Sequence, residues 1–167
     1  MAALVVYYSK KGENHSKNGI VRLEKGNTAY VAEFIAEKIG APIFEIEPET
    51  AYPDNYKECV AAAVEQFKGN ARPAVKSMPD MSGVDTLFVG FPDWCGTMPM
   101  VVWTFLEKCP ENITIVPFCT HGGSGMKNAP ADIEKLCPTC KVEKGFEVLG
   151  DDAKDSKTAV FEWLQNR

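Results

Sequence analysis

The sequence lacks the long apolar runs that would be needed to cross a membrane. Its apolar stretches are all well short of the roughly 18 consecutive residues that indicate a membrane-spanning helix. The amino-terminal stretch, Met1-Ala2-Ala3-Leu4, also lacks the basic region of a secretory signal peptide. We therefore expect no membrane insertion and a cytoplasmic protein.

Positive charge is also in short supply. The chain has 18 Lys and Arg against 23 Asp and Glu, a formal net charge of −5. Proteins that bind nucleic acids usually carry a basic patch, so no nucleic-acid partner is expected. Six cysteines without a signal peptide favour free thiols in a reducing compartment over a disulfide framework.

Metal ligands at zinc-like spacing are equally scarce. The single C-x-x-C, Cys137 to Cys140, has no second pair beside it, so we predict no structural metal. It follows the carboxyl end of a predicted helix, whereas a thiol is activated at the amino end. We interpret it as a turn with two incidental cysteines, with a redox dithiol as the alternative.

What the chain does have is a regular alternation of strand-like and helix-like segments. A continuous apolar run marks the first strand, and residues at helical spacing mark a helix that Gly40 ends. Asp54 is the expected cap of the second helix, and residues 70–85 are an expected loop. The predicted strands are residues 4–8, 43–47, 86–91, 113–118 and 145–149. The predicted helices are residues 28–39, 56–67, 101–106, 132–136 and a last helix with Ala159, Val160, Trp163 and Leu164 on its inner face.

Five strands alternating with five helices predict an α/β fold with a doubly wound, five-stranded parallel sheet. The first, third and fourth strands are the most apolar and should be central, whereas the second and fifth carry charges and should be edges. This places the strands in the order 2-1-3-4-5. Without repeats or a linker, residues 1–167 are expected to form one domain.

Two loops follow the third and fourth strands and carry the most distinctive residues. The third strand runs into Phe91-Pro92-Asp93-Trp94-Cys95-Gly96-Thr97, and the fourth into Cys119-Thr120-His121-Gly122-Gly123-Ser124-Gly125. Ligands of open α/β sheets bind at the carboxyl ends of strands, so these loops can form two walls of one slot. Trp94 is a suitable residue to cover a flat ring.

The first loop is long and polar. Ser9-Lys10-Lys11-Gly12-Glu13-Asn14 follows the first strand, and Gly26-Asn27-Thr28 opens the first helix after eleven intervening residues. A helix amino terminus offers unpaired N–H groups and a positive dipole end, which suit a phosphate. Asn27 and Thr28 can alternatively serve only as helix caps. The length of the loop favours the functional interpretation.

Together these loops resemble the flavodoxin family, and more narrowly flavodoxin-like proteins with an extended first loop. The family's phosphate loop, Ser/Thr-x-Thr-Gly-Asn-Thr, is split here between residues 9–14 and 26–28. Related chains carry Tyr-Pro-x-Trp-Trp-Gly-Thr where this one has residues 91–97, and they closely share residues 117–125. The resemblance extends from Leu4 to Gly150 and implies a flavodoxin-like three-layer sandwich.

The resemblance also implies non-covalent binding of FMN. The phosphate would lie against the first loop, and the isoalloxazine ring between the third and fourth loops. The cofactor site implied in this way consists of Ser9, Lys10, Gly12, Asn14, Gly26, Asn27, Thr28, Pro92, Asp93, Trp94, Cys95, Gly96, Thr97, Thr120, His121, Gly122, Gly123 and Gly125.

Three residues of this site raise questions of their own. Cys95 replaces the second Trp of the family pattern, which removes one aromatic contact. Asp93 replaces an apolar residue, and an anion beside the flavin would oppose the addition of negative charge, unless its side chain points to solvent. His121 either donates a hydrogen bond to a flavin oxygen or a proton to a substrate, or only braces the glycine turn.

The expected function is electron transfer by bound FMN, with redox proteins as partners. The first alternative is an NAD(P)H-dependent FMN oxidoreductase that acts on quinones or similar acceptors. The second is a cofactor-free signalling or interaction module of the same fold. Such a module needs a phosphoacceptor Asp at the strand ends, where this chain has Ser9 and Pro92, so we disfavour it.

Overall fold

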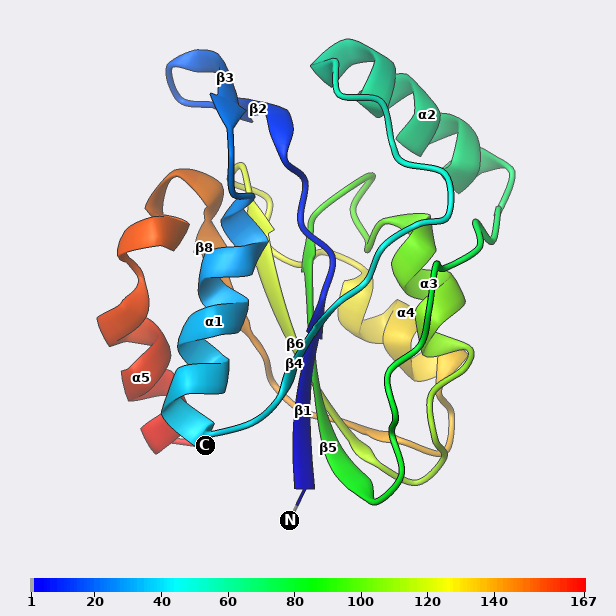
Figure 1. Ribbon diagram of the computed structural model, residues 1–167, viewed down its shortest axis with the longest axis vertical. Coiled ribbons are helices and arrows are strands. Elements are labelled where there is room, and N and C mark those ends of the chain that lie inside the picture. Colours follow the sequence, from blue (N-terminus) through cyan, green and yellow to red (C-terminus); the bar gives the residue numbers. More distant parts are fainter. Residues whose placement is uncertain (1) are drawn as a thin grey trace.

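A parallel sheet forms the middle of the molecule in the computed structural model, which describes residues 2–167 (Figure 1). Strand β4 lies at one edge, followed by β1, β5 and β6, and the short β7 and β8 both pair with the outer edge of β6. This confirms the predicted order 2-1-3-4-5 with polar edges. The strands are β1 (Ala2–Tyr7), β4 (Ile43–Glu45), β5 (Val84–Pro92), β6 (Thr114–His121), β7 (Lys141–Val142) and β8 (Phe146–Leu149).

Helices cover both faces of the sheet (Figure 1). Helices α1 (Asn27–Ile39) and α5 (Lys157–Gln165) lie on one face, and α3 (Met100–Leu106) and α4 (Ala129–Leu136) on the other. Helix α2 (Tyr56–Lys68) stands apart from the sheet, at the end of the molecule that also carries a small hairpin. The three layers of the predicted sandwich are therefore present.

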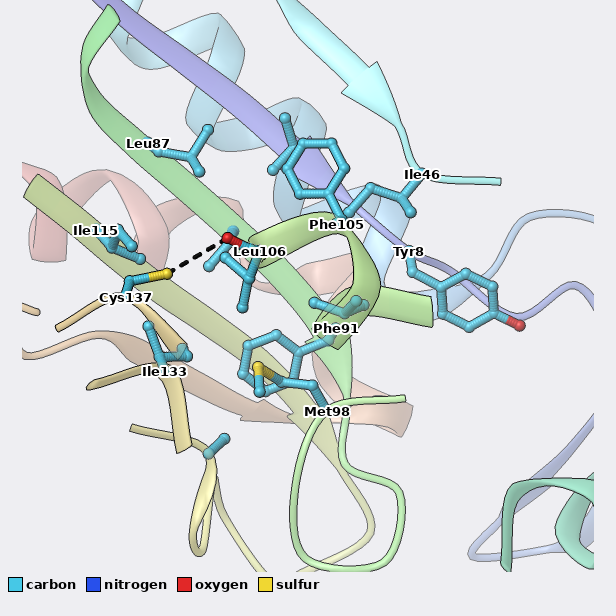
Figure 2. Close-up of a cluster of buried hydrophobic side chains, with 14 of the residues drawn as sticks. Tyr8, Ile46, Leu87, Phe91, Met98, Phe105, Leu106, Ile115, Ile133 and Cys137 are labelled. Atoms are coloured by element: carbon cyan, nitrogen blue, oxygen red, sulfur yellow. Dashed lines mark hydrogen bonds between the residues drawn. The ribbon is translucent and has the colours of Figure 1, made fainter. Parts of the chain in front are cut away.

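Each face of the sheet has its own apolar core because side chains alternate along a buried strand. Val5 and Phe88 pack under α1 and α5, whereas their neighbours Val6 and Leu87 pack under α3 and α4. Figure 2 shows the second core, where Phe105 lies over the central strands. Fully burying one such side chain contributes about 1.5–3 kcal/mol.

The outer edge of β6 is broken by a proline. The backbone N–H of Glu143 donates to the carbonyl of Ile115 (2.9 Å), so alternate residues of β6, including Pro117, face this edge. Pro117 has no N–H to offer. A Cβ on Gly145 would come within 1.9 Å of the Pro117 carbonyl oxygen, so the chain passes closely there without pairing. The strand predicted over residues 145–149 is present as β8, and the short β7 before it was not predicted.

Some local predictions are corrected. The side chain of Asn55, not of Asp54, accepts the capping hydrogen bond from the N–H of Glu58 (3.0 Å). Ala159 is exposed rather than on the inner face of α5. The first loop contains an antiparallel hairpin, β2 (Gly12–Ser16) and β3 (Gly19–Leu23), that was not predicted.

The C-x-x-C forms the predicted turn, with the N–H of Cys140 donating to the carbonyl of Cys137 (3.0 Å). Burial, with a contribution from Cys140, raises the pKa of the Cys137 thiol to about 11. Its Sγ lies 3.5 Å from the carbonyl oxygen of Leu106 in the core (Figure 2). All six cysteines of the chain are free.

Candidate functional site

A cleft of about 560 Å³ lies where β5, β6 and the start of α1 meet the hairpin and α2. It brings together residues from all three loops that the sequence had singled out. The predicted residues that line it are Lys10, Asn14, Asn27, Thr28, Pro92, Asp93, Trp94, Cys95, Thr120, His121 and Gly122. Those that do not line it are Ser9, Gly12, Gly26, Gly96, Thr97, Gly123 and Gly125.

Helix α1 points its amino terminus at this cleft. Its N-cap residue, Gly26, has no side chain to cap the first turn, and the hydroxyl of Ser9 accepts from the N–H of Ala29 instead (3.1 Å). A Cβ on Gly26 would lie 2.1 Å from that hydroxyl oxygen, so only glycine fits. The cap leaves the first-turn N–H groups of Asn27 and Thr28 for an anion. Ser9 therefore caps this helix, and its place beside a phosphate stays a prediction.

Two buried hydroxyls join this helix to the fourth loop. The Oγ1 atoms of Thr28 and Thr120 lie 2.9 Å apart, and the two residues are 1% and 4% exposed. Either hydroxyl can be the donor. The pair joins the start of α1 to the end of β6.

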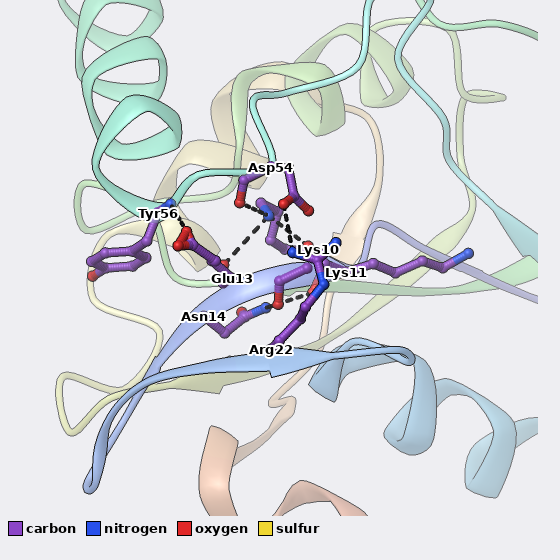
Figure 3. Close-up of polar contacts among 8 residues, drawn as sticks. Lys10, Lys11, Glu13, Asn14, Arg22, Asp54 and Tyr56 are labelled. Atoms are coloured by element: carbon purple, nitrogen blue, oxygen red, sulfur yellow. Dashed lines mark hydrogen bonds and ion pairs between the residues drawn. The ribbon is translucent and has the colours of Figure 1, made fainter.

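The hairpin is held by a polar network at its base (Figure 3). The Nζ of Lys10 donates to the carbonyls of Lys11 (2.5 Å) and Asp54 (3.2 Å), and Asn14 Nδ2 donates to the carbonyl of Lys10 (2.9 Å). A Cβ on Gly12, with φ 78°, would collide with the Asp54 carboxylate. Lys10, Gly12 and Asn14 therefore build the loop.

The same network ties the hairpin to α2. Arg22 pairs with Asp54 (2.6 Å), which lowers the pKa of that carboxyl, and the N–H of Tyr56 donates to Glu13 Oε2 (3.2 Å). The Arg22–Asp54 pair is exposed on both sides, so its contribution to stability is small. The pair instead helps to position the hairpin and α2, because it joins these two elements at the sides of the cleft.

The third loop is a tight turn. Trp94 and Thr97 exchange backbone hydrogen bonds (2.9 and 3.1 Å), and the residues between them, Cys95 (φ 58°) and Gly96 (φ 76°), are both left-handed, as in a type I′ turn. The ring of Trp94 meets that of Tyr52 edge-on, with centroids 4.9 Å apart. The turn thus presents Trp94 to the cleft. The Thr97 hydroxyl points elsewhere, donating to Asp132 (2.7 Å).

The fourth loop is braced by His121. Its Nδ1 accepts from the N–H of Gly123 (2.9 Å), as the bracing interpretation predicts. In the neutral ring the proton is therefore on Nε2, which is left as a donor. Gly125, with φ 70°, lets Glu147 approach, and Glu147 accepts from the N–H of Met126 (2.9 Å). Gly123 and Gly125 therefore shape the loop.

The side chain of Asp93 is half-buried, and its two carboxylate oxygens have different surroundings. Its Oδ2 accepts from the hydroxyl of Ser124 (2.5 Å), and its Oδ1 is buried with no hydrogen-bond partner among residues 2–167. Burial, and then the charge of Asp93, raise the pKa of the neighbouring Cys95 thiol. Asp93 thus lines the cleft, and one of its carboxylate oxygens is buried without a donor among residues 2–167.

One wall of the cleft was missed in the sequence. Helix α2 contributes Tyr56, Cys59, Val60, Ala63 and Val64, for which the sequence predicted only a place in the helix over residues 56–67. Their spacing is the same for a helix on a sheet and a helix over a cleft. Exposure distinguishes a helix that borders a cleft from one that packs on a sheet, and Val60 of α2 is 43% exposed. Other lining residues that were not predicted are Glu13, His15, Ser16, Lys17, Leu149, Gly150, Asp151 and Asp152.

Two other kinds of site are not found in the described part of the chain. Among residues 2–167, no group of three or more His, Cys, Asp or Glu is arranged to hold a metal ion. No helix within the same range has the length and apolar character to cross a membrane.

Comparison with known proteins gives a consistent picture. The family model for flavodoxin matches residues 23–167. A proposed flavoprotein from Bacteroides uniformis ATCC 8492 has a TM-score of 0.80 at 25% identity, covering 98% of this chain and 97% of its own. A flavoprotein from Lactobacillus acidophilus NCFM in complex with FMN has a TM-score of 0.68 at 21% identity, covering 95% and 98%. No curated protein matches the chain.

Proposed function

The chain belongs to the flavodoxin family, and from this we propose that it binds FMN non-covalently in the cleft and transfers electrons between redox proteins. The flavin supplies reversible one- and two-electron chemistry when bound. The protein supplies binding, orientation and electrostatics.

One observation carries the proposal: the amino terminus of α1 and the loops after β5 and β6 open into a single cleft. Its α1 end offers the N–H groups of Asn27 and Thr28, which suit a phosphate. Its other end has Trp94 and His121 on neighbouring loops, which suit a flat ring. A volume of about 560 Å³ is typical of a cofactor site.

Titration of the flavin-free protein with FMN and with riboflavin tests the binding. FMN should bind more tightly, because only FMN carries the phosphate that the α1 terminus would hold. Equal affinities would contradict the phosphate site. Binding of neither ligand would contradict the proposal as a whole.

A second candidate function has its own observation. The apolar residues Val60 and Val64 of α2 line the same cleft, and such a wall also suits a small flat acceptor. This supports an NAD(P)H-dependent FMN oxidoreductase that acts on quinones or similar molecules. Stopped-flow mixing of the FMN-loaded protein with NADPH separates the two candidates. An electron carrier is reduced slowly and an oxidoreductase rapidly.

The place of this chemistry in the cell is part of the proposal. Six free thiols, several of them buried, suit a reducing compartment, and we propose the cytoplasm. Labelling of the thiols in freshly lysed cells tests this, because a disulfide-rich population would point to an oxidising compartment.

A further inference from the structure

Three of the six free cysteines pack in or against one apolar core, away from the cleft. Cys109 follows α3, and Cys137 and Cys140 begin and end the turn after α4. The residue after this turn, Lys141, donates its N–H to the carbonyl of Ile113 (3.0 Å), just before β6 begins. The cleft lies at the other end of β6, and none of these three cysteines lines it.

The turn holds the backbones of Cys137 and Cys140 close together. The N–H of Cys140 donates to the carbonyl of Cys137 (3.0 Å) and closes a tight turn with Pro138 at its second position. The first and last Cα atoms of such a turn lie within about 7 Å, and disulfides join Cα atoms about 4.4–6.8 Å apart. The N–H of Cys137 also donates to Ile133 in α4 (2.9 Å), so the helix anchors the start of the turn.

The two thiols also face the same short segment. The Sγ of Cys137 donates to the carbonyl of Leu106 and the Sγ of Cys140 to that of Pro110, each at 3.5 Å (Figure 2 shows the first contact). Thiols are weak donors, so little is lost when their protons are removed. The Leu106 carbonyl also accepts the N–H of Cys109 (3.2 Å) and therefore keeps a partner when Cys137 is oxidised.

Access differs between the two thiols. Cys137 is 6% exposed, whereas Cys140 is only partly buried, so a reagent in solution meets Cys140 first. We propose that Cys137 and Cys140 are a modification site, which reacts with low-molecular-weight disulfides such as oxidised glutathione and closes to an intramolecular disulfide.

The reaction has two steps. The thiolate of Cys140 attacks one sulfur of oxidised glutathione, so that one glutathione stays bound to Cys140 and the other leaves. The sulfur of Cys137 then attacks that of Cys140 and expels the second glutathione. The two protein thiols lose two electrons, and their protons pass through solvent to the two glutathione thiols that are formed.

The surroundings of Cys137 make this disulfide slow to form and slow to reduce. Burial raises the pKa of the Cys137 thiol to about 11, and the carboxyl end of α4 does not activate it. Cys137 therefore attacks slowly. Once formed, the disulfide has no charge to bury, and its reduction at Cys140 has to expel Cys137 as a poor leaving group.

Mass spectrometry of the parent protein tests the proposal without any cofactor, so its outcome does not depend on the proposed function. Trypsin cleaves after Lys135 and Lys141, so one peptide contains both Cys137 and Cys140. Their disulfide lowers the mass of this peptide by two hydrogen atoms and blocks its alkylation. The protein is equilibrated with oxidised and reduced glutathione, either folded or in urea, then quenched with acid, alkylated and digested.

The equilibrium constant for the disulfide should be about 10-fold or more higher in the folded protein than in urea, because the fold has already ordered the turn. Equal constants would show that the fold does not favour the pair, and the proposal would be overturned. A disulfide between Cys109 and either partner would join two tryptic peptides, and its formation in place of the Cys137–Cys140 disulfide would also overturn the proposal.

Serine variants test the order of the steps, since a serine hydroxyl can donate to the same carbonyl as the thiol it replaces. Cys137→Ser should accumulate glutathione on Cys140, whereas Cys140→Ser should leave Cys137 unmodified. Cys109→Ser is the matched control and should form the disulfide as the parent does. If Cys137→Ser does not fold, acid quenching of the parent at early times should still trap glutathione on Cys140. Glutathione found first on Cys137 would overturn the assigned order.

Discussion

The buried hydroxyl pair between Thr28 and Thr120 gives a sharp prediction about how the cleft is held together. Valine has nearly the shape of threonine, so Thr28→Val and Thr120→Val remove one hydroxyl each with little change in packing. Each single variant leaves the other hydroxyl buried, at 4% or 1% exposure, without its partner. Stranding a buried hydroxyl costs about 1–3 kcal/mol. The double variant leaves no hydroxyl without its partner. Its loss of unfolding free energy should therefore be smaller than the sum of the two single losses.

Urea unfolding of the FMN-free protein measures these costs. With a slope of about 1–3 kcal/mol per molar urea, each single variant should lower the midpoint by about 0.5–1 M. FMN has to be absent, because a ligand that binds only the folded state adds its own stabilisation. The coupling between the two sites should be about 1 kcal/mol or more. Strictly additive losses would show that the two hydroxyls do not interact, and the reasoning would be wrong.

Three further predictions concern the cleft. The side-chain amide of Asn27 lines the cleft beside the first-turn N–H groups of α1 and can donate to the same phosphate. Asn27→Ala removes this amide and should weaken FMN binding about 10- to 100-fold while nearly sparing riboflavin, and calorimetric titration that found equal losses would contradict a phosphate at α1. Trp94→Phe should remove most of the tryptophan fluorescence quenching that FMN causes, and unchanged quenching would assign the reporter to another tryptophan. Asp93→Asn should speed alkylation of Cys95 by iodoacetamide at a fixed, mildly alkaline pH. Asp93 raises the pKa of that thiol, so loss of its charge increases the reactive thiolate, whereas an unchanged rate would show that the two groups are not coupled.

Most of the fold could be predicted from the sequence because the residue patterns that indicate its strands and helices are local. The apolar runs of β1, β5 and β6 are continuous, as buried parallel strands require, and the charged β4 is an edge strand. Gly40 ends α1 in the left-handed conformation that its place after the helix predicts. The loops at the strand ends then had to meet, because parallel strands bring their carboxyl ends to one side.

The remaining features depend on contacts that sequence patterns do not encode. Strand β2 is polar and short, so nothing in residues 12–16 alternates as a strand should. Ser9 caps a helix twenty residues further along the chain, a relation visible only in three dimensions. The split of β7 from β8 follows from which side of β6 Pro117 faces. The role of α2 follows from where the helix docks, since its apolar spacing is the same in either setting.

The contact between Gly26 and Lys10 has a consequence for how this architecture can diversify. A Cβ at Gly26 would lie only 2.7 Å from the Lys10 carbonyl oxygen, so residues 11–25 leave and rejoin the body of the protein at nearly the same point. Closing such a loop costs only about 0.6 kcal/mol more for each doubling of its length. Ser9, which caps α1, lies outside this segment. The hairpin can therefore be replaced by a loop of another length while β1, α1 and the cap on α1 stay in place. Related proteins with this sheet can thus differ in the residues that border the cleft.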